Sequence, residues 1–479
     1  MPSNAVIRLA MGAGRGVLSL VLAMVLFAGV LAAGSAPARA GIGAWIVVDM
    51  ETGAVLDQQA ARRQWYPASI TKLMTAYLTF KAMREGRADK TSVVTVSANA
   101  HSMPPSKIGF KPGTRITLDT ALKMLIVKSA NDIAVAVAES IGGSEPGFIA
   151  MMNEEARRLG MSATHFVNPH GLPDNGQVSS ARDLAVLARA LWREFPEHRH
   201  YFQVAGLRLG NKLLKSANRE FLARVPGANG MKTGYVCNSG LNVVVTATRG
   251  GRTVMAVILG AASGVERAAK ARVLLEDGFR TRSGRSLDQL TGVSGRPPAD
   301  GYCKRNERPS AEDLMAAYAG GGSRSGGSVL SFAAAGVSRP PALQGLAAPV
   351  AGDDDDDVPT KENGKTDWAK VMDEVIGPRQ RDNAPIRVSV AVPAGATPPR
   401  VAGVPASAIA TVSGGVAAPG IPLPTPKPFT VAAGNDGPAA GAILVPSSPS
   451  SADAAPKPGS IFRGKPLVIV PRPLAAPRP

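Results

Sequence analysis

The 479-residue chain has few cysteines, few aromatic side chains and, after its first forty residues, no long apolar runs. Its two cysteines, Cys237 and Cys303, exclude a disulfide-rich scaffold and leave either one disulfide or two unpaired thiols. Beyond residue 40 no stretch offers the roughly eighteen consecutive apolar residues that a spanning helix needs. Of the five histidines, only His198 and His200 are closely spaced, so we expect no metal site and no cofactor.

The first forty residues have the three-part pattern of a secretory signal peptide. Arg8 and Arg15 precede an apolar run over 17–33, and small residues follow as far as Ala40. We therefore predict a signal peptide over residues 1–40 that is cleaved, with a retained membrane anchor as the alternative. The protein is expected to be exported to the periplasm or the cell envelope outside the cytoplasmic membrane.

Composition divides the remainder unevenly. Residues 41–285 have patterned apolar periodicity, whereas 286–479 are rich in Pro, Ala and Gly and predict a mostly disordered basic tail with possible short helices at 310–318 and 367–376. The run Asp353–Asp357 lacks the alternating ligands and glycine of a calcium loop and is interpreted as a solvated acidic stretch. The formal net charge of +18 favours anionic envelope polymers as partners of the tail, and export makes nucleic acid an unexpected partner.

Within the domain, strands at both ends enclose a helical middle. This order predicts an α+β fold, an antiparallel sheet packed with helices. The expected strands lie at 44–49, 54–57, 241–248 and 253–259, and the expected helices at 69–85, 118–127, 132–141, 147–159, 181–192 and 265–279.

The pair Ser69 and Lys72 stands at the start of a predicted helix, about one turn apart on one face. A lysine can activate a serine hydroxyl if its surroundings lower its pKa from about 10.4 toward neutrality. A Ser-x-x-Lys sequence arises by chance about once or twice in a chain of this length, so the pair alone is weak support for catalysis.

A Ser-x-Asn sequence occurs three times, beginning at Ser97, Ser129 and Ser216. Ser129 and Asn131 lie at the break between two predicted helices, a place suited to reach across a cleft. Ser97 and Ser216 are expected to be turn or capping residues. Context therefore selects Ser129 and Asn131.

The sequence Lys232-Thr233-Gly234 occurs once, immediately before the terminal strand pair. In this order the three sequences match the set shared by penicillin-binding proteins and serine β-lactamases. Over about residues 41–279 the chain resembles low-molecular-weight D-alanyl-D-alanine carboxypeptidases, in the stretches 66–72, 128–132, 166–172 and 229–235.

The resemblance implies a penicillin-binding, β-lactamase-like transpeptidase sandwich and an acyl-enzyme mechanism. Ser69 would attack the carbonyl of the penultimate D-Ala, with Lys72 as its base, and Ser129 would relay a proton to the leaving amine. The backbone N–H groups of Ser69 and Tyr235 would hold the oxyanion.

The resemblance also implies how the substrate is bound. Asn131 would bind the substrate amide, and Lys232, Thr233 and Gly234 would hold the terminal carboxylate. Lys232 would help to keep Lys72 neutral. The implied partners are peptidoglycan stem peptides ending in D-Ala-D-Ala, with β-lactams as covalent inhibitors.

Other activities share these residues. A class A β-lactamase needs a glutamate that activates the deacylating water, and no Glu lies between Arg158 and Glu194. A DD-endopeptidase would use the same site, and a non-catalytic wall-binding scaffold is a further alternative. His170 is interpreted as a structural loop residue. Because every motif precedes Phe279, the tail is expected to be dispensable for chemistry.

Overall fold

The computed structural model describes residues 41–299, 301–319, 361 and 364–401. All of them belong to the first of two compact units, residues 1–414. The predicted signal peptide, the acidic run at 353–357 and the second unit, 415–479, lie outside the described residues. No helix of the described residues is long and apolar enough to cross a membrane.

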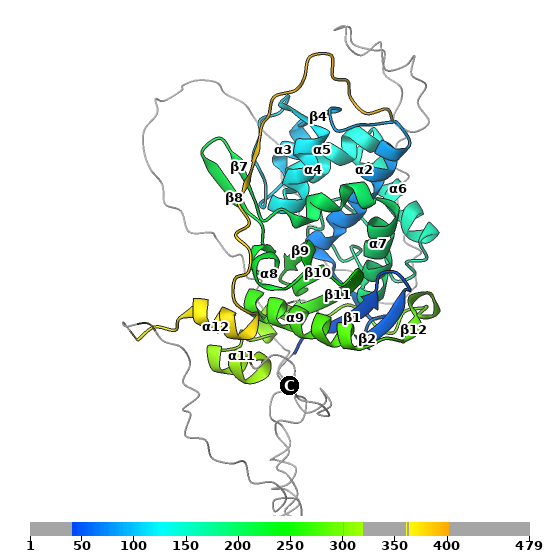
Figure 1. Ribbon diagram of the computed structural model, residues 1–479. Helices are drawn as coiled ribbons and strands as arrows, with labels where there is room; N and C mark the ends of the chain where they lie inside the picture. The colour runs from blue at the N-terminus through cyan, green and yellow to red at the C-terminus, as the bar shows by residue number, and fades with distance from the viewer. Residues whose placement is uncertain (1–40, 300, 320–360, 362–363, 402–479) are drawn as a thin grey trace, which may run out of the picture. The chain divides into compact units, whose positions relative to one another are not determined.

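A six-stranded sheet with antiparallel neighbours forms the centre of the domain (Figure 1). All six residues of its first strand are buried, as are most residues of the two long strands at the terminal hairpin. Both faces are therefore covered, which explains why these strands have continuous rather than alternating apolar sequences. In spatial order the strands are β12 (Arg285–Ser286), β2 (Ala54–Gln59), β1 (Ala44–Asp49), β11 (Arg252–Ala261), β10 (Gly240–Arg249) and β9 (Ala228–Val236).

Helices cover the two faces of the sheet. The helix α7 (Ala181–Glu194) packs on one face, and the helix α9 (Gly264–Arg280) packs on the other. Each helix is capped at its N-terminus by a serine, Ser180 or Ser263, whose side chain accepts a hydrogen bond from a backbone N–H of the first turn. At the centre of the helical half lies α2 (Lys72–Arg84), whose residues are mostly buried because α5, α6 and α7 surround it. The neighbouring helices are α4 (Leu118–Lys123), α5 (Asn131–Gly142) and α6 (Glu145–Arg158).

Shorter elements connect these layers. They are β3 (Gln64–Trp65), η1 (Ala68–Thr71), β4 (Val93–Thr95), α3 (Ala98–Ser102), β5 (Arg115–Thr117), η2 (Met124–Lys128), β6 (Ser179–Ser180), η3 (Pro196–Gln203), β7 (Gly206–Leu209), β8 (Lys212–Lys215), α8 (Arg219–Arg224) and η4 (Leu287–Gln289).

The α+β prediction is confirmed, and so are the opening strand pair, the helical middle and the closing hairpin and helix. Several shorter elements were not anticipated, and two further differences bear on the site. The Lys232-Thr233-Gly234 stretch lies inside the nine-residue strand β9 rather than in a segment before the sheet. The hairpin β7–β8 was also missed, because its short strands contain charged residues and little alternation.

The packed structure continues past residue 285, where the sequence placed the end of the domain. Cys303 forms a disulfide with Cys237. The neighbouring Tyr302, at the start of α10 (Tyr302–Arg305), meets Trp65 edge-on with ring centroids 5.3 Å apart. Its hydroxyl also donates to the backbone oxygen of Gly260. A covalent link and one aromatic anchor thus order a stretch whose composition suggested a tail. The helix α11 (Ala311–Tyr318) follows and packs on α9.

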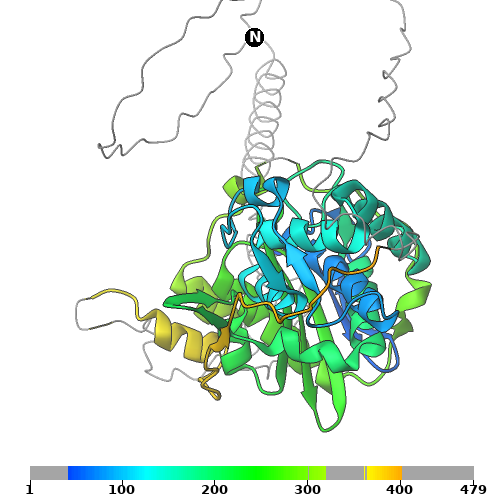
Figure 2. The same ribbon diagram turned by 90° about the horizontal axis from the view of Figure 1, so that it is seen from above.

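A second tail segment, 364–401, runs along the domain and is called the strap below (Figures 1 and 2). It begins with α12 (Trp368–Val375), whose Val371 and Val375 are buried. Its short strand β13 (Ile386–Val388) pairs in parallel with β7. Farther along, the Thr397 carbonyl accepts from Val93 N–H at 2.9 Å. The strap is ordered by backbone hydrogen bonds to the domain, which composition does not reveal.

Candidate active site

The turn that presents Ser69 is fixed by close backbone contacts. Ala68 has a φ of +50°, which is unusual for a residue with a side chain. Gly171, at φ +83°, lies so close to this turn that a Cβ there would be 1.9 Å from the Ala68 oxygen. Asn242 from β10 donates to the Tyr66 oxygen at 2.9 Å. The turn leaves Ser69 half-buried, within reach of a ligand.

Lys72, one helical turn after Ser69, is fully buried and makes three contacts through Nζ. It lies 2.8 Å from Asn131 Oδ1 and 2.6 Å from the His170 backbone oxygen, both of which can only accept hydrogen bonds. The third contact is Ser69 Oγ at 3.0 Å. A neutral amine has two N–H groups and one lone pair. With both N–H groups given to the two acceptors, the lone pair is left for the Ser69 hydroxyl proton.

The electrostatics of the site favour the neutral form of this amine. Burial, followed by the nearby charge of Lys232, lowers the pKa of Lys72 well below its ordinary value, while Asp132 opposes the shift. Burial, helped by Arg267, also lowers the pKa of Lys232, to about 7. Three basic side chains therefore share this buried region, and an anion that binds beside Lys232 would favour its protonated form.

Ser129 stands at the break between η2 and α5 that the sequence predicted. It closes the π-turn η2 with a left-handed backbone, φ +61°, a conformation that re-aims the chain and is often found at functional sites. Its Oγ accepts a hydrogen bond from Lys232 Nζ at 2.9 Å. Lys232 also donates to the Thr233 backbone oxygen at 2.8 Å. Ser129 and Lys232, which are far apart in the sequence, are therefore in direct contact.

Asn131 is almost completely buried, and its amide is held at both ends. Its Oδ1 accepts from Lys72, and its Nδ2 donates to the Pro104 oxygen at 3.0 Å. These contacts show that the side chain orients the Lys72 amine. One Nδ2 hydrogen remains for the substrate amide that the resemblance assigns to Asn131, so the two roles are compatible.

Strand β9 passes directly over the Ser69 turn. A Cβ at Gly234 would lie 2.8 Å from the Pro67 oxygen and 3.0 Å from the Ser69 nitrogen, so only glycine allows this approach. Next to it, Thr233 is half-buried and Tyr235 is 56% exposed. The backbone of residues 234–235 thus lies beside the Ser69 N–H, where the resemblance assigns the oxyanion donors.

The His170 side chain takes no part in a Ser–His pair. Burial, reinforced by the charge of Lys72, lowers its pKa to about 3, and its Nδ1 accepts from the Leu172 N–H at 3.1 Å. A structural loop role fits these contacts. The hydrogen bond from Lys72 Nζ to the His170 backbone oxygen could not be predicted from the sequence, because every residue has a backbone carbonyl.

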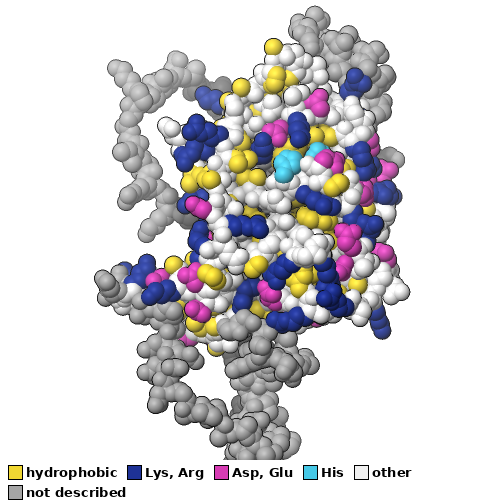
Figure 3. Space-filling model, viewed as in Figure 1, with side chains coloured by type: hydrophobic (Ala, Val, Ile, Leu, Met, Phe, Trp, Pro, Cys, Tyr) yellow, Lys and Arg dark blue, Asp and Glu magenta, His cyan; other side chains and the backbone are white. Residues whose placement is uncertain are grey.

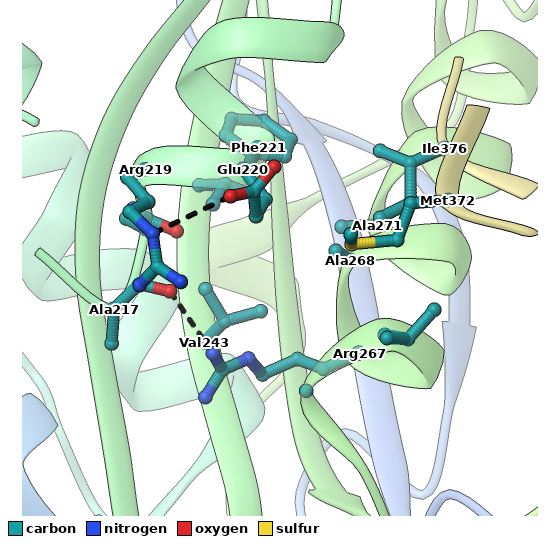
Figure 4. A pocket seen from close by; sticks show the side chains of 14 residues that line it. Ala217, Arg219, Glu220, Phe221, Val243, Arg267, Ala268, Ala271, Met372 and Ile376 are labelled. Atoms are coloured by element: carbon teal, nitrogen blue, oxygen red, sulfur yellow. Dashed lines mark hydrogen bonds and ion pairs between the residues drawn. The ribbon is translucent and has the colours of Figure 1, made fainter. Parts of the chain in front are cut away.

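Arg267, in the first turn of α9, was also missed. Its guanidinium donates to the backbone oxygen of Ala217 at 3.3 Å (Figure 4). It also donates to the backbone oxygen of Asn242 at 3.4 Å, and no carboxylate of the described residues pairs with it. It borders a cavity of about 320 Å³ that Met372 and Ile376 help to line. This arginine brings positive charge to the site from behind the sheet, and nothing in the sequence placed it near Lys232.

The other Ser-x-Asn sequences behave as expected. Ser97 caps α3 by accepting from the Ala100 N–H at 2.9 Å, and the Ser216 side chain accepts from the Asn218 N–H at 3.1 Å in a turn. Among the described residues no three His, Cys, Asp or Glu side chains are grouped to hold a metal ion.

Comparison with known proteins agrees with these motifs. Residues 32–263 match the family model described as D-alanyl-D-alanine carboxypeptidase. The chain is 37% identical over 248 residues to D-alanyl-D-alanine carboxypeptidase DacD of Salmonella typhimurium, covering 50% of this chain and 64% of that protein. It is 31% identical over 246 residues to DacB2 of Mycobacterium tuberculosis, covering 47% of this chain and 78% of that protein.

A solved structure is also similar. Penicillin binding protein 6B from Escherichia coli is 34% identical, with 51% of this chain and 80% of that chain covered and a TM-score of 0.48. The match spans less than two thirds of the Salmonella protein, so the two chains share only part of their length.

Proposed function

The chain belongs to the D-alanyl-D-alanine carboxypeptidase family, and from this premise we propose that it is a serine-type carboxypeptidase that removes the terminal D-Ala from peptidoglycan stem peptides. The single observation that carries the proposal is the arrangement around the Lys72 amine, whose two acceptor-only partners leave its lone pair for Ser69 Oγ.

Acylation starts with proton transfer from Ser69 Oγ to Lys72 Nζ. The oxygen then bonds to the carbonyl carbon of the penultimate D-Ala, and the developing oxyanion is held by the backbone N–H groups of Ser69 and Tyr235. One such donor is typically worth about 3 kcal/mol. No metal is required for these steps, since the base and the donors are all supplied by the chain.

The leaving D-Ala amine must gain a proton as its C–N bond breaks. Lys72, protonated in the first step, is the source, and the Ser129 hydroxyl relays the proton. The product is an ester between the peptide and Ser69. Water then gives a proton to Lys72 and bonds to the ester carbon. As the bond to Ser69 Oγ breaks, Lys72 returns this proton to Ser69, so the shortened peptide leaves with the enzyme in its starting state.

Recognition of the free carboxylate distinguishes a carboxypeptidase from a general acyl transferase. Lys232 stands beside Ser129, and Thr233 and Gly234 follow on β9, next to the Ser69 turn. The incoming carboxylate favours the charged form of Lys232 and so raises its pKa from about 7. Binding of the carboxylate is therefore coupled to protonation of Lys232, and it weakens as the pH rises above the pKa of Lys232 in the free protein.

β-Lactams have a carboxylate next to a reactive amide and are proposed to acylate Ser69 in the same way. Slow release, and hence inhibition rather than hydrolysis, is favoured because no Glu lies between Arg158 and Glu194 to activate water. A DD-endopeptidase would share every residue named above and is the second candidate. We place the enzyme in the periplasm or envelope, following the predicted signal peptide.

The test uses three substrates side by side. The protein is incubated with a fluorescent penicillin, a peptide ending in D-Ala-D-Ala, and a cross-linked peptide dimer, and labelling, D-Ala release and monomer formation are followed. Labelling together with D-Ala release faster than dimer cleavage supports the carboxypeptidase. If the dimer is cleaved faster than D-Ala is released, the protein is a DD-endopeptidase. If neither product forms, the protein is a non-catalytic scaffold.

A further inference from the structure

The C-terminal end of the edge strand β9 has little support from the sheet itself. Among the described strands β10 is its only neighbour, and its other edge must stay open if a substrate is to reach Ser69. A strand with one neighbour opens more easily at its ends than a central strand does. Tyr235, whose backbone N–H is proposed to hold the oxyanion, is the last residue but one of β9. The position of this N–H therefore depends on what holds the turn that follows, residues 237–239.

A short segment beyond the domain predicted from the sequence holds this turn. The segment consists of residues 301–306, includes α10, and is called the clamp below. Cys303 is joined to Cys237 by the disulfide, with the two Cα atoms 4.8 Å apart, and its N–H donates to the Cys237 backbone oxygen at 2.8 Å. The Gly301 N–H donates to Asn238 Oδ1 at 3.1 Å. One covalent bond and two hydrogen bonds therefore tie consecutive residues of the turn to the clamp.

The clamp also contacts the segment that leads to Ser69. The Tyr302 ring packs edge-on against Trp65, which is buried. Trp65 Nε1 in turn donates to the Ser239 backbone oxygen at 2.9 Å, so the indole connects the turn to the strand β3. Only three residues separate Trp65 from Ser69. The two proposed oxyanion donors, the N–H groups of Tyr235 and Ser69, are therefore placed by elements that meet at the clamp.

The clamp is itself fixed to the sheet. The Tyr302 hydroxyl and Asn306 Nδ2 both donate to the Gly260 backbone oxygen near the end of β11, at 3.1 and 3.0 Å. Both side chains are buried. Gly260 has no room for a side chain, because an added Cβ would lie 2.7 Å from the Trp65 ring and 3.0 Å from the Tyr302 hydroxyl. Because this contact is closely packed, a displacement of the clamp is transmitted to the turn and to β3.

We propose that Cys303 and Tyr302 are positioning residues of the active site, through which the clamp sets the Tyr235 N–H relative to the Ser69 N–H. The inference rests on the proposed function. Oxyanion donors act over about 2.7–3.1 Å, so a shift of about 1 Å in one donor slows acylation strongly. A disulfide persists only in an oxidising compartment, so the enzyme reaches full activity only in such a compartment.

The titrating groups of the site are held by contacts of their own. Lys232 donates to Ser129 Oγ, and the Lys72 amine is held by Asn131 Oδ1 and the His170 backbone oxygen. Loss of the clamp should therefore slow acylation while the initial binding of a carboxylate ligand and the pH profile stay as in the parent. A general loss of stability would not separate these quantities, so their separation identifies a positioning role.

The experiment follows penicillin acylation of the full chain at increasing penicillin concentration, which separates the acylation rate constant from the dissociation constant of the initial complex. The disulfide variant is Cys237→Ser with Cys303→Ser, and the ring variants are Tyr302→Ala and Tyr302→Phe. The matched control, Val371→Ala, truncates a buried side chain of α12 and lowers stability away from the clamp. Side chains of both charges cover the surface at α12 (Figure 3), and this substitution changes none of them. Circular dichroism and urea unfolding verify that each variant is folded under the assay conditions.

We expect the acylation rate constant to fall about tenfold or more in the disulfide variant and in Tyr302→Ala, with the dissociation constant and the pH profile of the parent. Tyr302→Phe keeps the ring against Trp65 and should retain most of the rate, and Val371→Ala should retain all of it. Reduction of the parent with a phosphine should reproduce the disulfide variant, and reoxidation should restore the rate. The disulfide variant should not respond to the reductant.

A folded disulfide variant that is acylated at the rate of the parent would overturn the inference. An equal loss of rate in Val371→Ala, or a change confined to the dissociation constant, would also overturn it. A parent protein that is not acylated and releases no D-Ala would instead refute the proposed function, and the inference with it.

Discussion

Lys232 Nζ donates a hydrogen bond to Ser129 Oγ over 2.9 Å, joining the edge strand β9 to the turn that ends η2. The contact closes the site between the sheet and the helices, and it brings a buried cation to the group proposed to pass a proton to the leaving amine. The first prediction concerns this cation.

Lys232→Ala should abolish most of the turnover of a free-acid peptide and move the acidic limb of the pH–rate profile upward. The shift follows because removal of a neighbouring positive charge raises the pKa of Lys72, which then becomes neutral only at higher pH. Lys232→Arg keeps the charge and should be impaired less, although its planar group fits the site poorly. A peptide amidated at its terminal carboxylate is the control and should be a poor substrate even for the parent. Parent-like turnover of the free acid by Lys232→Ala would contradict the carboxylate assignment.

The parent enzyme should also lose kcat/KM on the alkaline side. Lys232 must be protonated to bind the carboxylate, and its pKa in the free protein is about 7 rather than near 10.4. The basic limb measured with a free-acid peptide should therefore begin near neutral pH. The limb in kcat should lie at higher pH, because bound carboxylate raises the pKa of Lys232. Coincident limbs in the two profiles would show that this lysine does not respond to substrate.

Asn131→Asp replaces an acceptor of Lys72 by a carboxylate of nearly the same shape. An opposite charge within about 4 Å raises a lysine pKa, so penicillin acylation by Asn131→Asp should be slower than that of the parent at neutral pH and recover partly at higher pH. Asn131→Ala should lose activity without this recovery. If both variants have the same pH profile, Asn131 does not orient the Lys72 amine.

Gly171→Ala tests the contact that fixes the Ser69 turn. A Cβ at this position would overlap the Ala68 oxygen, so we expect a stability loss of roughly 3 kcal/mol together with slower acylation. Gly86→Ala is the matched control, because Gly86 also has a positive φ, +68°, but nothing lies within 4 Å of its added Cβ. Urea unfolding and penicillin labelling of both variants distinguish them, and equal losses would show that the backbone angle alone matters.

The structure changes the expectation for truncated chains. The sequence suggested that a protein ending near residue 285 would keep its activity, but that end removes Cys303 and Tyr302, which anchor the end of β9 and Trp65. Loss of such a disulfide typically costs about 2–5 kcal/mol. A protein ending at 319 should fold, with lower stability than one ending at 401 because Val371 and Val375 are no longer present to bury apolar surface. Equal denaturation midpoints for the two longer proteins would show that the strap contributes nothing to stability.

The sequence allowed the candidate catalytic residues to be chosen, because the chemistry expected of them requires particular side chains. Ser69, Lys72 and Lys232 were recognised by type and order, and the choice of Ser129 over Ser97 and Ser216 agrees with the contact that Ser129 makes with Lys232. The helices and the closing hairpin followed from apolar periodicity, since both depend on local pattern.

The remaining features depend on contacts that residue type does not encode. The His170 carbonyl is a backbone group, and Arg267 approaches Lys232 only through the fold of α9 against the sheet. The short helix expected at 367–376 is present as α12. The rest of the strap is held by hydrogen bonds such as that between Val93 and Thr397, of which its Pro-rich composition gave no indication. Each of these omissions is a contact between residues far apart in the sequence.

The most direct test of the account is to expose the parent and Ser69→Ala to a β-lactam and to a peptide ending in D-Ala-D-Ala, and to measure intact protein mass and released D-Ala. The Ser69 hydroxyl supplies the bond to the substrate, and truncation of this half-buried polar group should leave the fold intact. We expect one added β-lactam mass on Ser69 and D-Ala release for the parent, and neither for a folded Ser69→Ala protein. A β-lactam adduct or undiminished D-Ala release with folded Ser69→Ala would contradict the assignment of Ser69 as the nucleophile.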